Sequence, residues 1–372
     1  MRTYRVEADK YICNISDRYF EINEYTKKFL EYYNDRVTIE EIAQKEGIEV
    51  DEVSSIYEQI SDMIKESNYS DTEDFFSPLS VQWKITNRCN LKCKHCYIGD
   101  KCNDSIDKKS IEIIVEKIIK SSVLKLTISG GEALLVDNLD EICEKVISAG
   151  IKVKIFTNGY YLVDFLSKLD RRKIRYSDLT ICVSVDGLRN VHDNIRGEES
   201  FDKLIAGILE CKKRGITVIT NTVINDYNAD DIIDLFQYLH SIGVKEIQCS
   251  KLIELGYARK YKIKPVGKEK YVDICNELSK LPFSVKYSTY DGNTIINGEK
   301  IEEPDEWKCC AGISKFTILE NGNVVLCPFI SKTKIGNIVD QDIDEIWNSP
   351  NRISARQLIR NNNYGSSKCF IL

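Results

Sequence analysis

Six strand-like runs alternate with helix-like runs between residues 81 and 250. The strands are expected at 81–86, 123–129, 151–157, 179–185, 216–223 and 245–250, and the helices at 107–121, 138–149, 161–169, 200–213 and 229–241. Gly150, Gly215 and Gly243 each follow a helical run, as left-handed residues at helix ends do. This order predicts an α/β fold in which a parallel sheet curves into a partial (β/α)6, TIM-like barrel.

Three cysteines follow the first strand-like run at the spacing C-x3-C-x2-C, namely Cys89, Cys93 and Cys96. Three thiolates on a short loop can hold three irons of a cubane cluster and leave the fourth iron without a protein ligand. The alternative is a zinc knuckle with His95 as fourth ligand, although zinc ligands normally come as two separated pairs and His95 adjoins Cys96.

Short motifs rich in glycine and polar residues end the next three strand-like runs. They are Gly130–Glu132, Thr157–Gly159 and Ser184–Gly187. Each motif alone is weak, because Gly-Gly and Asp-Gly are common turn formers. Working residues of such barrels lie at the carboxyl ends of the strands, so the ordered set predicts a site at that edge.

The cysteine loop followed by Gly130–Glu132 resembles the radical S-adenosylmethionine (radical SAM) enzymes, and residues 86–91 and 184–187 are similar to members that modify peptides. The resemblance covers residues 81–330. It implies a [4Fe-4S] cluster held by Cys89, Cys93 and Cys96, which are the expected catalytic ligands. The cluster would act with S-adenosylmethionine and yield a 5′-deoxyadenosyl radical.

The same resemblance assigns cofactor-binding residues. His95 is expected near the adenine, while Gly130 and Gly131 let the backbone approach the amino group. Glu132 is expected to fix the loop. Ser184 would reach the ribose or carboxylate of the cofactor, and Arg196 would pair with the carboxylate, against the alternative of a surface arginine.

A second cysteine set lies near the C-terminus, around an Asn321-Gly322 turn that predicts a hairpin. Its spacing resembles the opening of the SPASM auxiliary-cluster domain of peptide maturases, although only Cys369 follows Cys327. The resemblance therefore implies the shortened, twitch-like form with one auxiliary [4Fe-4S] cluster. Expected ligands are Cys309, Cys327 and Cys369, with Cys310 or an open iron site completing the set. Buried hairpin cysteines are the alternative.

Residues 1–75 are predicted to form a winged-helix-like arrangement. Strands are expected at 4–8, 11–15 and 18–22, followed by helices at 24–33, 38–45 and 51–65. Thr38 and Glu41 form a capping-box pattern. The expected core positions are Phe29, Tyr32, Ile39, Ile42, Val53, Ile56, Ile60 and Ile64.

Charge separates this segment from the remainder of the chain. Residues 1–75 contain 9 Lys or Arg and 19 Asp or Glu, a net charge of −10, while the whole chain carries −6. Such a surface repels phosphates, so we expect no nucleic-acid partner. The segment instead resembles the peptide-recognition element (RRE) of ribosomal natural-product (RiPP) maturases. This implies that residues 1–70 bind a leader peptide at the strand edge 18–22, beside 53–64.

With 372 residues, 42% of them hydrophobic, the chain can hold several domains. We expect a winged-helix-like domain at 1–75, the barrel at 81–265 and a small α+β cluster-binding domain at 266–372, with Ser70–Pro78 as a linker. The N-terminus lacks an apolar run and no stretch is long enough to cross a bilayer. We therefore expect a cytoplasmic protein with no membrane partner.

The chain has 14 cysteines, which in the absence of an export signal indicate metal sites or reduced thiols. Those in apolar patterns are expected to be small buried residues: Cys143, Cys182, Cys211 and Cys249. Cys249 has a second interpretation, because related peptide epimerases use a thiol as hydrogen-atom donor.

The resemblance implies a radical SAM oxidoreductase that modifies a precursor peptide, with an oxidative thioether cross-link as the leading hypothesis. A peptide epimerase, a carbon-carbon cross-linking maturase and a dehydrogenase of a small molecule are the alternatives that use the same machinery. A zinc-binding winged-helix regulator is the alternative from another class. A low-potential electron donor, such as a ferredoxin or a flavodoxin, is expected as a second partner.

Overall fold

The computed structural model describes residues 4–7, 10–15, 18–34, 37–66, 75, 77–100, 106–288, 294–296, 299–301, 311–329 and 333–361. Most of the predicted linker Ser70–Pro78 lies outside these residues, as do Cys309, Cys310 and Cys369. Within the described part, none of the helices combines the length and apolarity needed to cross a bilayer.

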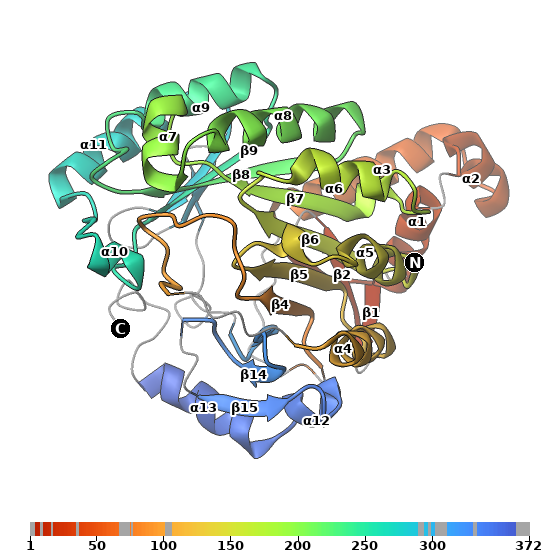
Figure 1. Cartoon of the computed structure of the whole chain (residues 1–372). Helices are drawn as coiled ribbons and strands as arrows, with labels where there is room; N and C mark the ends of the chain where they lie inside the picture. Colours follow the sequence, from red (N-terminus) through yellow and green to blue (C-terminus); the bar gives the residue numbers. More distant parts are fainter. Residues whose placement is uncertain are drawn as a thin grey trace.

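Six parallel strands form the centre of the molecule (Figure 1). They are β4 (Ser80–Thr86), β5 (Lys125–Gly130), β6 (Lys152–Thr157), β7 (Leu179–Ser184), β8 (Thr217–Ile224) and β9 (Glu246–Lys251). The helices that cover their outer face are α4 (Lys108–Lys120), α5 (Leu139–Ser148), α6 (Leu162–Leu169), α8 (Ser200–Lys213) and α9 (Ile232–Ser241). The predicted partial barrel is confirmed.

Local signals set the ends of these elements. The three glycines after helical runs adopt the predicted left-handed conformation, with φ of 83° at Gly150, 69° at Gly215 and 86° at Gly243. The sequence did not reveal α7 (Arg189–Arg196) or α10 (Tyr257–Lys260), which are short and follow β7 and β9. Both contact the cysteine loop.

The inner face of the barrel is polar at its first two strands, β4 and β5. On β4, Val81, Trp83 and Ile85 are buried in the main hydrophobic core with α4, while Gln82 and Lys84 lie on the opposite face and are only partly buried. Lys84 is in register with Ser129 of β5. A closed TIM barrel fills its interior with branched apolar side chains. This open barrel instead presents a surface suited to a polar ligand.

Further strands extend the sheet at both edges. Beyond β9 lie β10 (Val285–Ser288), β11 (Thr294–Ile296) and β12 (Glu299–Ile301), after α11 (Lys268–Leu278). Beyond β4 lie β13 (Lys315–Ile318), β14 (Asn323–Val325) and β15 (Lys334–Asn337), followed by α12 (Ile343–Trp347) and α13 (Pro350–Asn361). The predicted hairpin is confirmed, with Gly322 at φ 79°. Because β13 pairs in parallel with β4, this region continues the barrel core.

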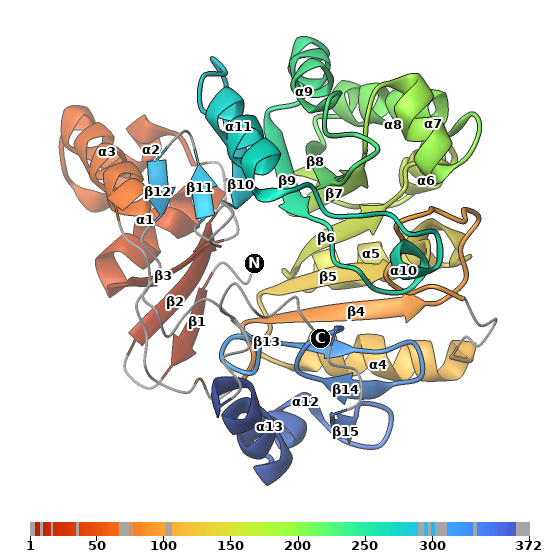
Figure 2. The same ribbon diagram turned by 90° about the vertical axis from the view of Figure 1, so that its left-hand side faces the viewer.

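The N-terminal segment forms a separate antiparallel sheet in the order β1 (Tyr4–Glu7), β2 (Lys10–Ile15), β3 (Arg18–Ile22). It packs beside α1 (Glu24–Asn34), α2 (Ile39–Glu46) and α3 (Val50–Glu66), as Figure 2 shows. The capping box is present, since the Glu41 N–H donates to Thr38 Oγ1 and the Thr38 N–H donates to the Glu41 carboxylate. The predicted winged-helix-like order is confirmed.

Most expected core positions of this segment are confirmed, namely Phe29, Ile42, Val53, Ile56 and Ile60, but Ile39 is not one of them. Ile39 is 37% exposed, because it begins α2 and its side chain lies outside the cluster formed by Phe29 and Ile42. Val53 and Ile60 of α3 are buried in that same cluster, so these two side chains do not line a peptide groove. A helix of this size has one apolar stripe, and the domain core uses it.

Candidate active site

The polar motifs meet at the carboxyl ends of the barrel strands, as the sequence predicts. The cysteine loop (Cys89–Cys96) follows β4, Gly130–Glu132 ends β5, Thr157–Gly159 ends β6 and Ser184–Gly187 ends β7. Each strand pairs in parallel with the next, so these ends share one edge of the sheet.

Backbone hydrogen bonds from three other elements hold the cysteine loop. The Glu132 N–H, just after β5, donates to the Arg88 carbonyl at 2.8 Å. The Lys94 N–H donates to a carbonyl in α7 at 2.9 Å, and the Tyr257 N–H of α10 donates to the Cys96 carbonyl at 2.8 Å. The positions of the thiols are therefore fixed by secondary structure.

Gly130 and Gly131 permit a close approach between β5 and the start of the cysteine loop. Gly130 has φ 155°, and a Cβ there would lie 2.4 Å from the Thr86 carbonyl oxygen. A Cβ on Gly131 would lie 2.3 Å from the Arg88 carbonyl oxygen. No larger residue fits at either position without moving backbone. This packing accounts for both glycines, and the expected contact with the amino group of the cofactor stays a prediction.

Glu132 links the ends of β5 and β6. Its carboxylate accepts hydrogen bonds from Thr157 Oγ1 at 2.6 Å, the Asn158 N–H at 2.7 Å and the Leu134 N–H at 3.0 Å. Burial raises the pKa of Glu132, while these three donors act in the opposite direction. The side chain thus orders the loop between two strands.

Two polar side chains approach the candidate cluster thiols. Arg196 Nη1 lies 3.8 Å from Cys93 Sγ, and Asn158 Nδ2 lies 4.0 Å from Cys89 Sγ. N–H groups directed at thiolate sulfur stabilise its negative charge and tune an iron–sulfur cluster. Among the described residues, no three His, Cys, Asp or Glu side chains converge closely enough for a single metal ion.

A buried carboxylate connects the cysteine loop with α7. Asp186 Oδ2 accepts from Arg196 Nε at 2.6 Å and lies 3.4 Å from His95 Nε2, while its Oδ1 accepts from the Val223 N–H at 3.1 Å. Burial opposes ionisation, yet the nearby charge of Arg196 prevails and lowers the pKa of Asp186 to about 2. Arg196 is 8% exposed, so it is not a surface arginine.

His95 is buried beside this pair. Burial lowers the pKa of His95 to about 4, so the imidazole is neutral near pH 7. Its Nδ1 has no hydrogen-bond partner among the described residues. A buried nitrogen of this kind fits a ligand that donates a hydrogen bond, such as a nucleoside. The expected position near the adenine stays a prediction.

His192 should make the apoprotein sensitive to acid. Its Nδ1 accepts the Asp186 N–H at 3.2 Å, and burial lowers the pKa of His192 from 6.5 to about 4. Between these values the unfolded chain binds a proton that the folded chain does not, so stability falls as pH decreases through this window. We expect a loss of about 3 kcal/mol from this group. Urea unfolding of His192→Asn should show a flatter pH dependence; an unchanged slope contradicts the linkage.

Ser184 and Cys249 lie on opposite faces of the sheet. Ser184 is in register with Asn221 and, through it, with Gln248, on the inner face. Cys249 is the next residue along β9 and packs in the hydrophobic core with Tyr271 of α11. The interpretation of Cys249 as a hydrogen-atom donor is therefore wrong, since its thiol faces away from the barrel interior.

Cys327, an expected auxiliary ligand, lies near the cysteine loop. Tyr97 follows Cys96 directly, and its ring contacts Phe329 with centroids 5.0 Å apart. Burial raises the pKa of Tyr97 to about 12, and Cys96 and Cys327 both add to this shift. The chain after β14 thus brings Cys327, whose ligand role stays a prediction, close to Cys96 at the end of the loop.

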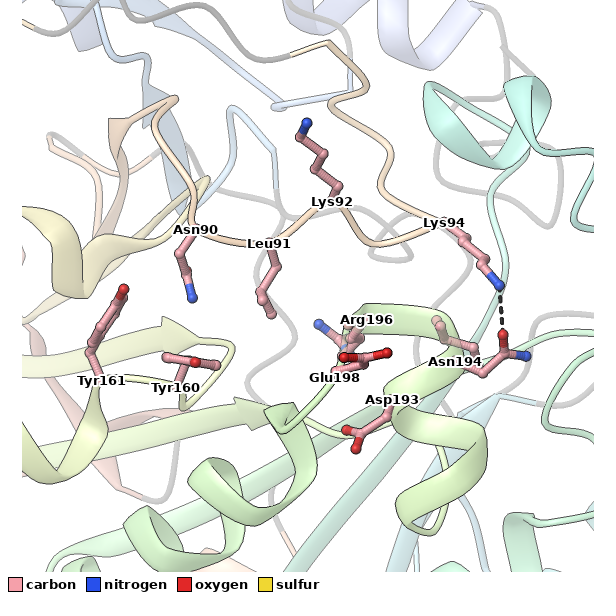
Figure 3. Close-up of a pocket in the computed structure, with 12 residues that line it drawn as sticks. Asn90, Leu91, Lys92, Lys94, Tyr160, Tyr161, Asp193, Asn194, Arg196 and Glu198 are labelled. Atoms are coloured by element: carbon pink, nitrogen blue, oxygen red, sulfur yellow. Dashed lines mark hydrogen bonds between the residues drawn. The ribbon is translucent and has the colours of Figure 1, made fainter.

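A cavity of about 440 Å³ adjoins the cysteine loop. Figure 3 shows Asn90 and Leu91 of the loop facing Tyr160, Tyr161 and the end of α7 across it. Arg196 lines the same cavity. The loop residues that line the cavity are Asn90, Leu91, Lys92 and Lys94, and none of the three cysteines of the loop lines it.

Sequence reasoning missed several residues of the site. Asp186 and Asn158 fall inside the expected motifs, but the sequence assigns neither of them a role. Gly256 belongs to none of the expected motifs, although a Cβ there would lie 2.6 Å from the Cys96 carbonyl oxygen. Its signal, an isolated Gly after the sixth strand, is too common to identify a site.

The partial barrel with a three-thiol loop at its carboxyl edge defines a class of iron–sulfur proteins that bind a small cofactor beside the cluster. Residues 83–239 match the radical SAM superfamily, and residues 309–370 match SPASM, an iron–sulfur cluster-binding domain. The chain thus contains a radical SAM domain followed by a C-terminal SPASM domain. The first domain implies a [4Fe-4S] cluster that acts with S-adenosylmethionine, and the second implies auxiliary iron–sulfur clusters.

Two curated relatives come from Bacillus subtilis (strain 168). The sporulation killing factor maturation protein SkfB is 26% identical over 75% of this chain and 67% of its own length. The antilisterial bacteriocin subtilosin biosynthesis protein AlbA is 26% identical over 76% of this chain and 62% of its own length. The similarity to both thus spans about two thirds of these longer proteins.

The fold is similar to that of SuiB from Streptococcus suis, solved with S-adenosylmethionine and with the precursor peptide SuiA. The two SuiB structures superpose with a TM-score of 0.66 at 18% identity, over 95% of this chain and 88–89% of that one. At this identity the likeness concerns the fold.

The described residues fit the radical SAM cofactors. Cys89, Cys93 and Cys96 stand on one backbone-fixed loop, and Arg196 directs an N–H toward one of their sulfurs. His95 adds a buried nitrogen without a partner among the described residues. Cys327 is the part of the auxiliary set that the structure describes.

Proposed function

We propose that this protein is a maturase of a ribosomally made peptide, that residues 1–70 bind the leader of the precursor, and that the reaction is an oxidative thioether cross-link. One observation carries the proposal: a small sheet, whose edge strand β3 pairs on one side only within the described residues, is joined in one chain to a partial barrel with the cysteine loop at the carboxyl end of its strands. The names of SkfB and AlbA, and the SuiB complex with SuiA, support a peptide substrate.

The leader is proposed to bind along β3. Within the described residues β3 pairs with β2 alone, in the antiparallel register Cys13↔Phe20, so its other edge has unpaired backbone groups. A peptide can add a strand there through main-chain hydrogen bonds with little demand on sequence. Because the apolar stripe of α3 is buried, specificity must come from other side chains of that helix.

The barrel interior is proposed to hold the core peptide. When bound, the cluster and S-adenosylmethionine supply a 5′-deoxyadenosyl radical. The chain contributes fixed charges that orient a peptide: Lys84 Nζ lies 3.3 Å from Glu320 Oε2, with the side chains 14% and 16% exposed. Arg196 and His95, which both lie beside Asp186, are proposed to orient the cofactor.

A single auxiliary [4Fe-4S] cluster is proposed in the C-terminal region, held by Cys309, Cys327 and Cys369, with Cys310 or an open site as the fourth position. The proximity of Cys327 to Tyr97 supports a cluster close to the substrate space. An auxiliary cluster there would accept the electron that remains after the new bond forms. An oxidative cross-link needs such an acceptor, because the peptide loses two hydrogen atoms overall.

Mass spectrometry of the modified precursor tests the reaction. We expect a mass loss of two hydrogens and a cysteine that no longer reacts with iodoacetamide. An unchanged mass in light water, with a gain of one unit in heavy water, would instead indicate an epimerase. A two-hydrogen loss with all cysteines still free would indicate a carbon-carbon cross-link.

Deletion of residues 1–70 should separate recognition from chemistry. We expect the truncated protein to cleave S-adenosylmethionine without peptide, but to bind the precursor at least about a hundredfold more weakly, because the strand edge is gone. Fluorescence titration with a labelled precursor measures the affinity, and 5′-deoxyadenosine release is the control. Unchanged affinity would remove the recognition role from this segment.

A further inference from the structure

The thioether cross-link must release one proton from the peptide. A C–H bond breaks as its hydrogen atom goes to the 5′-deoxyadenosyl radical, and the cysteine S–H bond then breaks as the C–S bond forms. The balance leaves one electron, which the auxiliary iron–sulfur site would accept, and one proton. Because an ordinary thiol has a pKa of about 8.5, it is mostly protonated near pH 7, and a base beside it assists this step.

Glu320 brings a carboxylate from the C-terminal region to the inner face of the barrel. It lies two residues after β13, which pairs in parallel with β4 through Ile318 and Trp83. Its Oε2 lies 3.3 Å from Nζ of Lys84, an inner-face residue of β4, and the two side chains are 16% and 14% exposed. The pair therefore lies in the space proposed for the core peptide.

One oxygen of Glu320 is shielded from solvent and accepts no hydrogen bond. Within the described residues its Oε2 has no hydrogen-bond partner, and the contact with Lys84 is an ion pair without hydrogen-bond geometry. Buried polar atoms normally have a partner, so this oxygen marks a place where a donor is missing. The S–H group of a bound peptide is such a donor.

Glu320 also lies near one thiol from each of the two cysteine sets. Burial raises the pKa of Tyr97 to about 12. Electrostatic interactions with Cys96, Cys327 and Glu320 add to this shift, so all three lie close to that ring. A peptide thiol beside Glu320 would be near the cysteine loop and also near an expected auxiliary ligand.

Other buried groups at this edge of the sheet are poorer proton acceptors. The Glu132 carboxylate already accepts three hydrogen bonds that order its loop. Asp186 is paired with Arg196, and its pKa of about 2 makes it a weak base. His95, with a pKa of about 4, is also a weak base. Of these groups, Glu320 is the one with a carboxylate oxygen that accepts no hydrogen bond.

We propose that Glu320 is the catalytic base that takes the thiol proton of the substrate cysteine, and that Lys84 is a positioning residue that holds its carboxylate. This role rests on the proposed function. As the C–S bond forms, the proton moves from sulfur to Glu320 Oε2 and the electron leaves toward the auxiliary site. The Glu320 side chain is 16% exposed, which gives the proton a path to water.

Glu320→Gln tests this role, because the amide keeps the size of the side chain but is not a base. Full-length, reconstituted protein is incubated with S-adenosylmethionine, dithionite and the cysteine-containing precursor peptide. At pH 7 we expect 5′-deoxyadenosine release within about threefold of wild type, but at least about a hundredfold less cross-linked peptide, since a general base contributes roughly 10²–10⁴-fold. Chromatography and mass spectrometry measure the two products, and the yield of cross-link per 5′-deoxyadenosine follows from them.

The pH dependence of this yield separates a base from a structural residue. At a pH of about 9 the substrate thiol ionises without help, so the yield of Glu320→Gln should rise at least about tenfold between pH 7 and pH 9 relative to wild type. Glu320→Asp retains a carboxylate and should give at least about tenfold more cross-link than Glu320→Gln at pH 7. Fluorescence titration of the precursor with cluster-free Glu320→Gln should give an affinity within about threefold of wild type.

Glu246→Gln is the matched control, because Glu246 is an exposed carboxylate at the start of β9, at the other end of the barrel strands. It should behave as wild type in all of these measurements. Lys84→Gln/Glu320→Gln removes both charges and replaces the single variant if that variant does not fold. It should show the same loss of yield at pH 7 and the same recovery at pH 9.

A wild-type yield in Glu320→Gln, or a loss that is equal at pH 7 and pH 9, would overturn the role of Glu320 as the base. An equal loss in Glu246→Gln, or a precursor affinity more than about tenfold weaker in Glu320→Gln, would overturn it as well. Failure of the proposed function appears differently, in the wild-type protein. It would cleave S-adenosylmethionine with the precursor present but give no peptide that has lost two hydrogens, and the base would then have no proton to take.

Discussion

Cys93→Ala is expected to abolish cleavage of S-adenosylmethionine and to lower the iron content associated with the cysteine loop. Cys93 is the middle thiol of the three, it is 8% exposed, and Arg196 directs an N–H toward its sulfur. Two thiolates cannot hold a cubane that leaves one iron open, so we expect 5′-deoxyadenosine production to fall by more than about a thousandfold. Chromatography of 5′-deoxyadenosine after anaerobic reduction measures it.

Cys143→Ala is the control for this prediction. Cys143 lies in α5, fully buried in the main hydrophobic core, and is a structural thiol. Its loss should cost about 1 kcal/mol of unfolding free energy and leave both iron content and cleavage unchanged. Cleavage that survives in Cys93→Ala, or disappears equally in Cys143→Ala, would refute the assignment of the cysteine loop.

Asp186→Ala is expected to produce the largest loss of stability among single changes at the site. Asp186 is fully buried and pairs with Arg196, which is itself 8% exposed. Removing the carboxylate leaves a buried guanidinium without its counter-ion and also frees the Val223 N–H. We expect the free energy of unfolding to fall by about 3–5 kcal/mol, measured by urea denaturation of the apoprotein.

Two further variants show whether the pair serves function as well as stability. Asp186→Leu/Arg196→Met replaces both charges with apolar groups and should recover most of the lost stability. It should still bind S-adenosylmethionine at least about tenfold more weakly than wild type, because the cofactor loses a bidentate partner. Wild-type affinity in this double variant would show that Arg196 does not contact the cofactor.

Asp178→Ala is the matched control, at the opposite end of β7. Asp178 is also buried, but its partner Arg175 is 36% exposed and remains solvated when the carboxylate is removed. The expected cost is about 1 kcal/mol, with cofactor affinity unchanged. If Asp178→Ala lowers the free energy of unfolding as much as Asp186→Ala does, then burial of the partner arginine does not explain the loss of stability.

The sequence predicted the elements whose signals are local. Each barrel strand and long helix follows its own apolar period. Thr38 marks a helix start through its side-chain cap, and Gly150 and Gly322 mark element ends through left-handed conformations that few other residues adopt. The candidate cluster loop was also visible, because three thiols at fixed spacing on one loop are rare.

The sequence did not predict features that depend on distant contacts. The role of Asp186 requires Arg196, His95 and Val223 to meet, and these residues lie on three different elements. The apolar residue Ile39 looks like a core residue in the helical pattern, yet it is exposed at the first turn of α2. The pairing of β13 with β4 joins segments more than two hundred residues apart.

The central claim is that Cys89, Cys93 and Cys96 hold a cubane with one open iron, where S-adenosylmethionine binds. Electron paramagnetic resonance of anaerobically reconstituted, reduced protein tests it most directly. We expect a [4Fe-4S]⁺ signal whose shape changes when S-adenosylmethionine is added, and the loss of that responsive signal in Cys93→Ala. A reduced cluster signal that is the same with and without S-adenosylmethionine, or stoichiometric zinc in place of iron, would contradict the account.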